Sequence, residues 1–449
     1  MYHSTSFFTA IKKIMSLIND RFIDHGSRVA YICYRMSLCD SDCPAEDLTK
    51  LVRAALVHDI GACKTEEIED LLHFEVTNSL PHSVYGYLFI KYFSSISSLA
   101  DVILYHHLPY ENAKIHTLAH EKYIFRIHLA DRIDILAHWN NDRDSILYAI
   151  ESRVGIAFSP EEFALFKEAD ARYNILAHIE DGSYEKELAE YYNGLTFSAR
   201  EIENLIKMLA FTIDFRSEQT ITHTIQVAHF AKLLGAKSGL SAEMQEKLYF
   251  AGLLHDFGKI KVPVAILEKN GPLTESEWPV MKHHAQWTRE ILDRLVTDEI
   301  RELAARHHEK LNGSGYPERL TEEQLSYPER LMAVADITSA LAGKRSYKEK
   351  MPREVIVSIL EEMTQEGLLD KRATELMTKH YEEFIAAAAG ETGEAARRYE
   401  ALKSEYATLI NRYKSLDDQF YATNEQLFAD LTASEQLRGI YLVPHRAQD

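Results

Sequence analysis

The sequence lacks the long apolar runs and the leader segment that mark membrane and exported proteins. No stretch approaches the roughly 18 consecutive apolar residues that a membrane-spanning helix requires. Residues 1–25 do not show the basic-then-apolar layout of an export signal. We therefore expect a cytoplasmic protein with no membrane partner.

Cysteine is scarce, with four residues, all in the first seventh of the chain: Cys33, Cys39, Cys43 and Cys63. They do not form the paired C-x-x-C spacing of a zinc site, so we interpret them as reduced cytosolic thiols.

Positive charge is also in deficit, because 50 Lys and Arg face 69 Asp and Glu for a formal charge of −19. Proteins that bind nucleic-acid polymers present a basic face, so this composition argues against such a partner. A small anionic substrate stays open, since a bound metal cluster and a few basic side chains set the local field.

The chain does contain ample material for buried cores. Its 449 residues with 46% apolar content predict two or three domains. Helix starts are well marked, as at Ser159-Pro160 and at Thr274 with Glu277, whereas alternating β-branched runs are rare. These patterns predict an all-α fold of two tandem helical domains followed by a long C-terminal helix or coiled coil.

Histidine and aspartate gather in one stretch of the sequence. The apolar run 248–254 ends in His255-Asp256, and Gly258 indicates that a helix stops there. Neutral imidazoles suit ions such as Zn, Fe and Mn, and a carboxylate can bridge two of them. The candidate metal ligands are His223, His255, Asp256, His284, His307, His308 and Asp336.

The same order of residue types occurs earlier in the chain, which indicates an internal repeat. Counterparts of the seven candidates are His25, His58, Asp59, His82, His106, His107 and Asp131. Five matched pairs lie 198, 197, 202, 201 and 205 residues apart, so the two copies differ only by small insertions.

The second copy resembles the HD-GYP family of bacterial cyclic dinucleotide phosphodiesterases over roughly residues 198–365. The resemblance rests on several separate motifs in the family's order: His255-Asp256-Phe257-Gly258-Lys259, Thr274 to Trp278, His307-His308-Glu309, Gly313-Ser314-Gly315-Tyr316-Pro317, Val334-Ala335-Asp336 and Lys344-Arg345-Ser346-Tyr347-Lys348.

The resemblance implies a metal-dependent hydrolase holding two divalent ions of Fe, Mn, Ni or Zn per catalytic domain. Asp256, as the bridging carboxylate, and Lys259, three residues further on, are the expected catalytic groups. The expected substrate contacts are Lys259, Arg345, Lys348, Gly313, Tyr316 and Pro317.

Some positions depart from the family pattern. Gln219 stands where trinuclear members carry Glu, so we expect a dinuclear centre. Asn312 and Ser339 replace family aspartates, which leaves the recognised bases open. The first expectation is hydrolysis of cyclic di-GMP to a linear dinucleotide, and the alternative substrate is 3′,3′-cyclic GMP-AMP.

Two other functions fit these residues less well. A nucleotide-sensing adaptor would bind without cleaving, but it has little need of Lys259 beside a full ligand set. A phosphohydrolase of mononucleotides is disfavoured by the segment from Gly313 to Pro317.

The first copy lacks several of these features. Ala62 stands in the place of Lys259, and Leu108-Pro109-Tyr110 follows His106-His107 without a Gly-Ser-Gly-Tyr-Pro segment. We expect a degenerate HD domain that holds metal without catalysing.

We place the domains at 1–195, 196–385 and 386–449. In the last, Leu402, Tyr406, Leu409, Tyr413, Leu416 and Phe420 recur at steps of four and three. This pattern is typical of a coiled-coil seam and predicts a homodimer through the C-terminal helix, although a helix packed on its own domain would show it too.

Overall fold

The structure is a computed structural model of the chain and describes residues 24–62, 80–113, 118–139, 142–195, 221–269, 271–343 and 351–433, with scattered positions from 201 to 211. Every regular element in these ranges is a helix, and strand-type pairing there is limited to two isolated bridges. The predicted all-α class is confirmed. None of the described helices is long and apolar enough to cross a bilayer.

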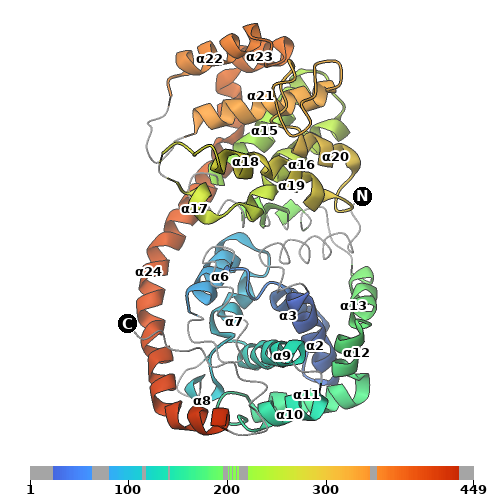
Figure 1. Cartoon of the computed structure of the whole chain (residues 1–449), viewed down its shortest axis with the longest axis vertical. Coiled ribbons are helices and arrows are strands. Elements are labelled where there is room, and N and C mark those ends of the chain that lie inside the picture. Colours follow the sequence, from blue (N-terminus) through green and yellow to red (C-terminus); the bar gives the residue numbers. More distant parts are fainter. Residues whose placement is uncertain are drawn as a thin grey trace. The chain divides into compact units, whose positions relative to one another are not determined.

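The described residues form two compact units, both visible in Figure 1. The first unit contains residues 24–195 and the part of the last helix from Leu402 onward. The second unit contains the described residues from 201 to Ala401. The domain boundaries given above stay a prediction.

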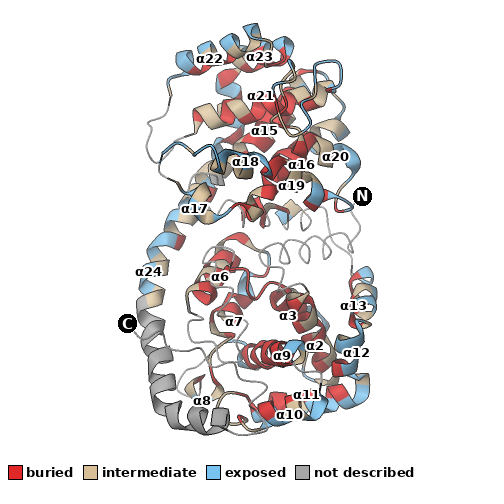
Figure 2. Cartoon of the chain, in the orientation of Figure 1, coloured by how far each residue is buried: buried red, intermediate tan, exposed pale blue. Residues whose placement is uncertain are grey.

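The first unit is built around one buried helix, α9 (Glu121–Trp139). Its residues from Tyr123 to Leu136 are all buried, which is typical of a helix at the centre of a core (Figure 2). The surrounding elements are α2 (His25–Cys39), α3 (Ala45–Leu56), α6 (Leu80–Phe93), η2 (Ser97–Leu99), α7 (Ala100–Tyr105), α8 (Tyr110–Ala113), α10 (Arg143–Glu151), α11 (Pro160–Tyr173), α12 (Ile175–Asp181) and α13 (Tyr184–Asn193).

In the second unit, α15 (Ile221–Lys237) packs against α16 (Ala242–Leu254) and α21 (Tyr327–Ala342). The other elements are η3 (Phe257–Lys261), α17 (Val264–Leu267), α18 (Glu277–Lys282), α19 (His284–Leu292), α20 (Asp298–Ala305), α22 (Arg353–Gln365), α23 (Lys371–Lys379) and the part of α24 (Tyr381–Ala433) up to Ala401.

Sequence signals at helix ends correspond to contacts in the structure. Ser159 caps α11 by accepting from the backbone N–H of Glu162. Thr274 and Glu277 exchange side chain to backbone hydrogen bonds of 3.3 and 2.7 Å, although α18 itself begins only at Glu277. The helix before His255 ends at Leu254, as the apolar run and Gly258 predicted.

The repeat extends to a backbone contact in each unit. A Cβ on Gly258 would lie 1.9 Å from the carbonyl oxygen of His284, and a Cβ on Gly61 would lie 1.9 Å from that of His82. Only glycine allows this approach. It brings the loop after the His-Asp pair against the helix turn that carries the next ligand candidate.

Candidate metal centres

In the second unit, six of the seven candidate ligands lie at the ends of helices, and the seventh lies in the middle of a helix. His223 lies in the first turn of α15, His255 and Asp256 follow α16, and His284 opens α19. His307 and His308 follow α20, and Asp336 lies midway along α21. All seven predicted residues come together in one cluster, which we call the second cage.

Asp256 is the central carboxylate of the second cage. Its Oδ2 lies 3.2 Å from His255 Nε2, and its Oδ1 lies 3.3 Å from His284 Nε2 and 3.9 Å from His307 Nε2. One carboxylate therefore faces two groups of imidazoles, so Asp256 would be able to hold two ions at once.

Asp336 closes the other side of the second cage. Its Oδ1 lies 3.1 Å from His223 Nε2 and 3.8 Å from His255 Nε2, and its Oδ2 lies 3.5 Å from His308 Nδ1.

Backbone carbonyls fix the orientation of three imidazoles. The Nδ1–H groups of His255, His284 and His307 donate to the carbonyl three residues earlier, at 2.7, 2.6 and 2.6 Å. Each Nε2 then points into the cage, which is how metal-binding histidines are usually held.

Several inward-facing atoms have no hydrogen-bond partner. His284 Nε2 and His307 Nε2 face each other at 3.3 Å, where two lone pairs repel unless a cation lies between them. His255 Nε2 and Asp256 Oδ1 are buried without a partner. Orphaned buried polar atoms are costly, so this donor set fits divalent metal ions.

The protonation states agree with this fit. Burial lowers the pKa of His284 to about 4 and that of His307 to about 3, which leaves both rings neutral at pH 7. Burial also acts to lower the pKa of His255, but the Asp256 carboxylate overrides it and raises that pKa to about 9. A cation is thus favoured beside Asp256, and a metal ion would replace that proton.

Lys259 lies on η3 beside the second cage. Its Nζ contacts Asp256 Oδ2 at 2.5 Å, and about a fifth of its side chain is exposed. Lys259, which we expected to contact the substrate, therefore pairs with Asp256 in this structure.

The loop from Gly313 to Pro317 forms one wall of the second cage. The ring centroid of Tyr316 lies 4.7 Å from that of His308. Gly313 takes a positive φ of 76°, whereas Gly315 does not. Gly315 is needed for another reason, because a Cβ there would lie 2.4 Å from the backbone nitrogen of Lys310.

Glu309 holds this loop in place. The side chain is buried, and its carboxylate accepts three backbone N–H groups, from Glu318 at 2.6 Å, Arg319 at 3.1 Å and Leu320 at 2.9 Å. The sequence analysis assigned Glu309 no role. The signal that could have found it is an acidic residue directly after two ligands and before a glycine-rich loop.

Two predicted substrate contacts, Arg345 and Lys348, lie outside the described residues, as does Gln219.

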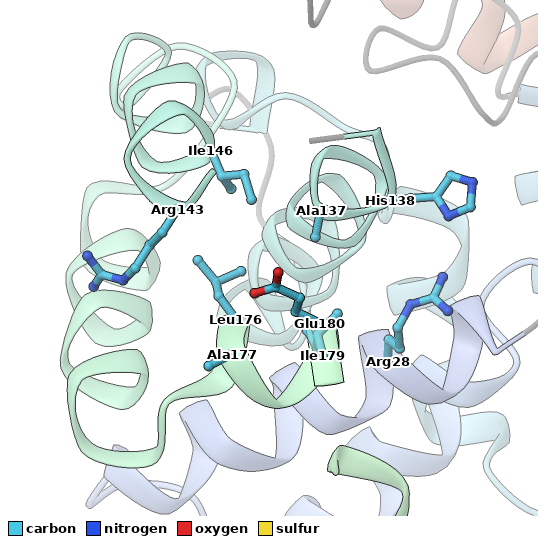
Figure 3. A pocket seen from close by; sticks show the side chains of 9 residues that line it. All are labelled: Arg28, Ala137, His138, Arg143, Ile146, Leu176, Ala177, Ile179 and Glu180. Carbon is cyan, nitrogen blue, oxygen red and sulfur yellow. The ribbon is translucent and has the colours of Figure 1, made fainter. Parts of the chain in front are cut away.

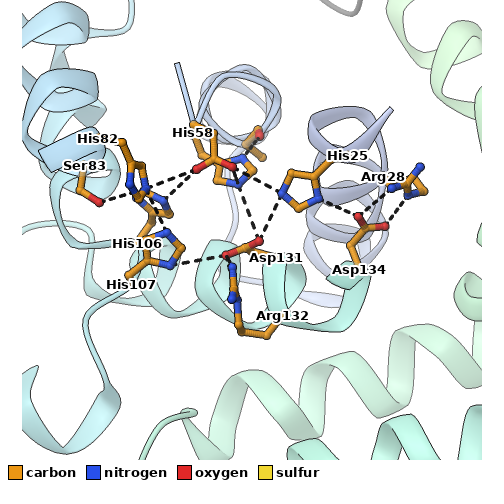
Figure 4. A network of polar contacts seen from close by, with 12 residues as sticks. His25, Arg28, His58, His82, Ser83, His106, His107, Asp131, Arg132 and Asp134 are labelled. Atoms are coloured by element: carbon orange, nitrogen blue, oxygen red, sulfur yellow. Dashed lines mark hydrogen bonds and ion pairs between the residues drawn. The ribbon is translucent and has the colours of Figure 1, made fainter. Parts of the chain in front are cut away.

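The first unit contains a matching cluster, the first cage (Figure 4). Asp59 is again central, with Oδ1 at 3.5 Å from His82 Nε2 and 3.4 Å from His106 Nε2, and Oδ2 at 3.3 Å from His58 Nε2. Asp131 Oδ1 lies 3.2 Å from His25 Nε2, and its Oδ2 lies 3.5 Å from His107 Nδ1. The seven predicted residues are therefore also brought together here.

Orphaned atoms occur in the first cage as well. Among the residues that the structure describes, Nε2 of His58 and of His106 and Oδ1 of Asp59 are buried without a hydrogen-bond partner. This donor set also fits metal ions.

Two arginines distinguish the first cage from the second. Arg132, buried, contacts Asp131 Oδ2 at 2.6 Å. Asp134 accepts from His25 Nδ1 at 2.7 Å and pairs with Arg28, whereas its counterpart Ser339 contacts His223 Nδ1 at 2.9 Å. Arg132 and Asp134 were not among the predicted site residues. The signal for them in the sequence is a pair of charged residues inside an otherwise apolar helix pattern.

A cavity of about 350 Å³ lies beside Arg28 in the first unit (Figure 3). Its other lining residues are Ala137, His138, Arg143, Ile146, Leu176, Ala177, Ile179 and Glu180. Because Arg28 also holds Asp134, contacts run from the first cage to this cavity.

Comparisons with known proteins identify the two units. One HD-domain family model matches residues 22–150 and another matches residues 205–373. The chain is 26% identical over 396 residues to 3′3′-cGAMP-specific phosphodiesterase 1 of Vibrio cholerae, covering 84% of this chain and 91% of that protein. It is 36% identical over 184 residues to the cyclic di-GMP phosphodiesterase response regulator RpfG of Xanthomonas campestris, covering 40% of this chain and 48% of that protein.

A crystal structure of a cyclic GMP-AMP-specific phosphodiesterase of Vibrio cholerae superposes with a TM-score of 0.52 at 19% identity, covering 87% of this chain and 98% of that one. At this identity the likeness shows a shared fold. The chain therefore belongs to the HD-domain proteins and carries two HD domains in tandem, the second of the HD-GYP type.

Proposed function

We propose that the chain is a metal-dependent phosphodiesterase that opens a 3′,5′-linked cyclic dinucleotide, with the second cage as its active site. The observation that carries the proposal is the pair of imidazole groups facing one central carboxylate, Asp256, next to the loop of Tyr316. We propose that two metal ions are bound, because the imidazoles of the second cage lie in two groups around one carboxylate, Asp256.

Two divalent ions, when bound, supply a hydroxide near neutral pH and neutralise charge on the phosphate. The chain's own residues prepare the site for this chemistry. His255, His284 and His307 are held with their Nε2 atoms inward by backbone carbonyls, so little reorganisation accompanies binding. Lys259 supplies an ammonium beside the bridging carboxylate, within reach of a bound phosphodiester.

The substrate we favour is 3′,3′-cyclic GMP-AMP. The sequence expectation placed cyclic di-GMP first, but the relative aligned over 84% of this chain is specific for 3′3′-cGAMP. The cyclic di-GMP relative from Xanthomonas aligns over only 40% of this chain. Asn312 and Ser339, which replace family aspartates, are consistent with a changed preference among the bases.

Incubation of metal-loaded protein with cyclic di-GMP, cyclic di-AMP and both linkage isomers of cyclic GMP-AMP tests the proposal, with products resolved by chromatography. We expect a linear dinucleotide from the 3′,3′ isomer and no product from the 2′,3′ isomer. Tight binding of a cyclic dinucleotide without any cleavage would instead support the adaptor function.

The first cage is proposed as a non-catalytic metal site. It has the ligand set but no counterpart of Lys259, and its Asp131 is already paired with Arg132. We also propose a bacterial cytoplasmic location, because the relatives named above are bacterial enzymes.

A further inference from the structure

One lysine of the second unit lies between two aromatic rings near the second cage. Lys282 ends α18, and its Nζ lies 5.7 Å from the ring centroid of Trp278 and 5.6 Å from that of Tyr316. Within the described part of the chain, Lys282 forms no ion pair with a carboxylate. Its charge is therefore available to an anion from outside.

This group is continuous with the second cage. Tyr316, which is half-buried, packs 4.7 Å from the His308 ring and 6.3 Å from the His284 ring. His308, Tyr316, Lys282 and Trp278 therefore follow one another from the second cage to the surface. Lys282 also precedes the ligand candidate His284 by only two residues, so the row is tied to the second cage by the chain itself.

Trp278 is the outer end of the row and is left uncovered. Its side chain is 48% exposed, on the six-residue helix α18. Among the residues that the structure describes, the Lys282 ammonium lies near the Trp278 ring, and no aromatic ring packs against that indole. A large indole in water next to a cation offers a stacking face to a planar ligand, as in proteins that bind unpaired bases.

The substrate class supplies two purines and two phosphates. With one phosphodiester at the second cage, the neighbouring nucleotide must lie several ångströms away from it, and the row begins at the second cage and reaches the surface. An ammonium suits the second phosphate, and an indole suits a purine face. These are the two groups that the row presents.

We infer that Trp278, Lys282 and Tyr316 form the subsite for the outer nucleotide of the cyclic dinucleotide. Its purine stacks on Trp278, and its phosphate, which is not the one cleaved, pairs with Lys282. This inference rests on the proposed function. Because every base has a stacking face, Trp278 contributes affinity to guanine and adenine alike, and it does not set the choice between them.

Steady-state kinetics on the full chain tests the subsite. Trp278→Ala should raise KM about tenfold with kcat nearly unchanged, since stacking contributes to binding rather than to bond cleavage. Trp278→Phe should restore most of the affinity. Trp139→Ala, in the first unit with a similar exposure of 50%, is the matched control and should behave as wild type.

Lys282→Gln should also raise KM and should make KM less dependent on salt, because one charge-assisted contact is lost. Metal content should stay at the wild-type level in all these variants. Equal KM values for wild type, Trp278→Ala and Lys282→Gln would overturn the subsite while leaving the phosphodiesterase intact. A wild type that cleaves no cyclic dinucleotide would overturn the proposed function itself.

Fluorescence gives a readout that does not depend on turnover. The chain has three tryptophans, so a variant with Trp139→Phe and Trp287→Phe reports on Trp278 alone. Rapid mixing of this metal-loaded variant with 3′,3′-cyclic GMP-AMP should quench its emission before the substrate is cleaved. Absence of quenching at concentrations well above KM contradicts stacking on this indole.

Discussion

At the residue scale, the two cages show how one ligand set is adapted by its neighbours. Both place an aspartate between two groups of imidazoles, at Asp256 and at Asp59. They differ in the cations beside the carboxylates, Lys259 in the second cage and Arg132 in the first. The ligand types alone therefore do not distinguish the proposed catalytic centre from the proposed non-catalytic one.

Matched histidine variants should separate the roles of the two cages. His284→Ala should lower kcat by more than about a hundredfold and release metal, because it removes an imidazole on Asp256. His82→Ala removes the equivalent imidazole on Asp59 and should leave turnover largely intact. Comparable losses of turnover in both variants would contradict the division of labour.

Glu309 is expected to act as a positioning residue for the loop of Tyr316. Glu309→Gln replaces a carboxylate that accepts three backbone N–H groups, and we expect kcat/KM to fall about tenfold. Glu309→Asp should recover part of the loss. Metal content measured on the same samples should be unchanged, and a loss of metal would show that Glu309 supports the second cage instead.

The ligand candidates could be predicted from the sequence because order and spacing recur in two copies, whereas their partners could not. Glu309 and Asp134 act through contacts with residues further along the chain or on another helix. Arg132 contacts its neighbour Asp131, but the sequence does not show that both side chains are buried in a cage. Gly315 illustrates the same limit. Its glycine was noticed, but the close approach to Lys310 exists only in the folded loop.

At the element scale, capping residues in the sequence predict where helices start. The sequence does not predict which partner the apolar face of a helix packs against. The seam of α24 was interpreted as a coiled coil. In the structure Leu402 is buried, and Tyr406 stacks on Tyr85 of α6 in the same unit, with centroids 4.1 Å apart. The side chains of Tyr413, Leu416 and Phe420 lie outside the description, and the homodimer stays a prediction.

The glycines next to the cages should be sensitive to a single added methyl group. In Gly258→Ala the new Cβ would meet the His284 carbonyl, so α19 must shift and carry His284 with it. We expect a loss of about 1–3 kcal/mol in stability together with most of the activity. Gly61→Ala should cost similar stability in the first unit but retain turnover, as measured by denaturant unfolding and initial rates.

At the scale of the whole molecule, stability should depend on metal and on pH. Metal bound to the folded chain alone stabilises it by about 2.7 kcal/mol at a hundredfold excess over Kd. Chelation should therefore lower the melting temperature in calorimetry. Repeating the scan after adding back Mn or Zn is the control, and a melting temperature indifferent to chelation would contradict metal binding in both cages.

The chelated protein should also lose stability on acidification. His284 has its pKa lowered from 6.5 to about 4 in the folded state, so between these values the unfolded chain binds more protons. Its contribution is present above pH 6.5 and is lost as the pH falls toward 4, at up to about 1.4 kcal/mol per pH unit. Denaturant unfolding at pH 7 and pH 5 measures the difference, which His284→Gln should reduce.

The cations that accompany the cages differ in one more respect. Arg132 is buried, and a guanidinium keeps its proton at any ordinary pH, so the positive charge of the first cage is fixed in position. Lys259 carries its charge on a flexible stem with a fifth of the side chain in solvent. A flexible ammonium beside Asp256 would be able to follow a phosphate that enters the second cage, whereas the guanidinium of the first cage is paired with Asp131 inside the core.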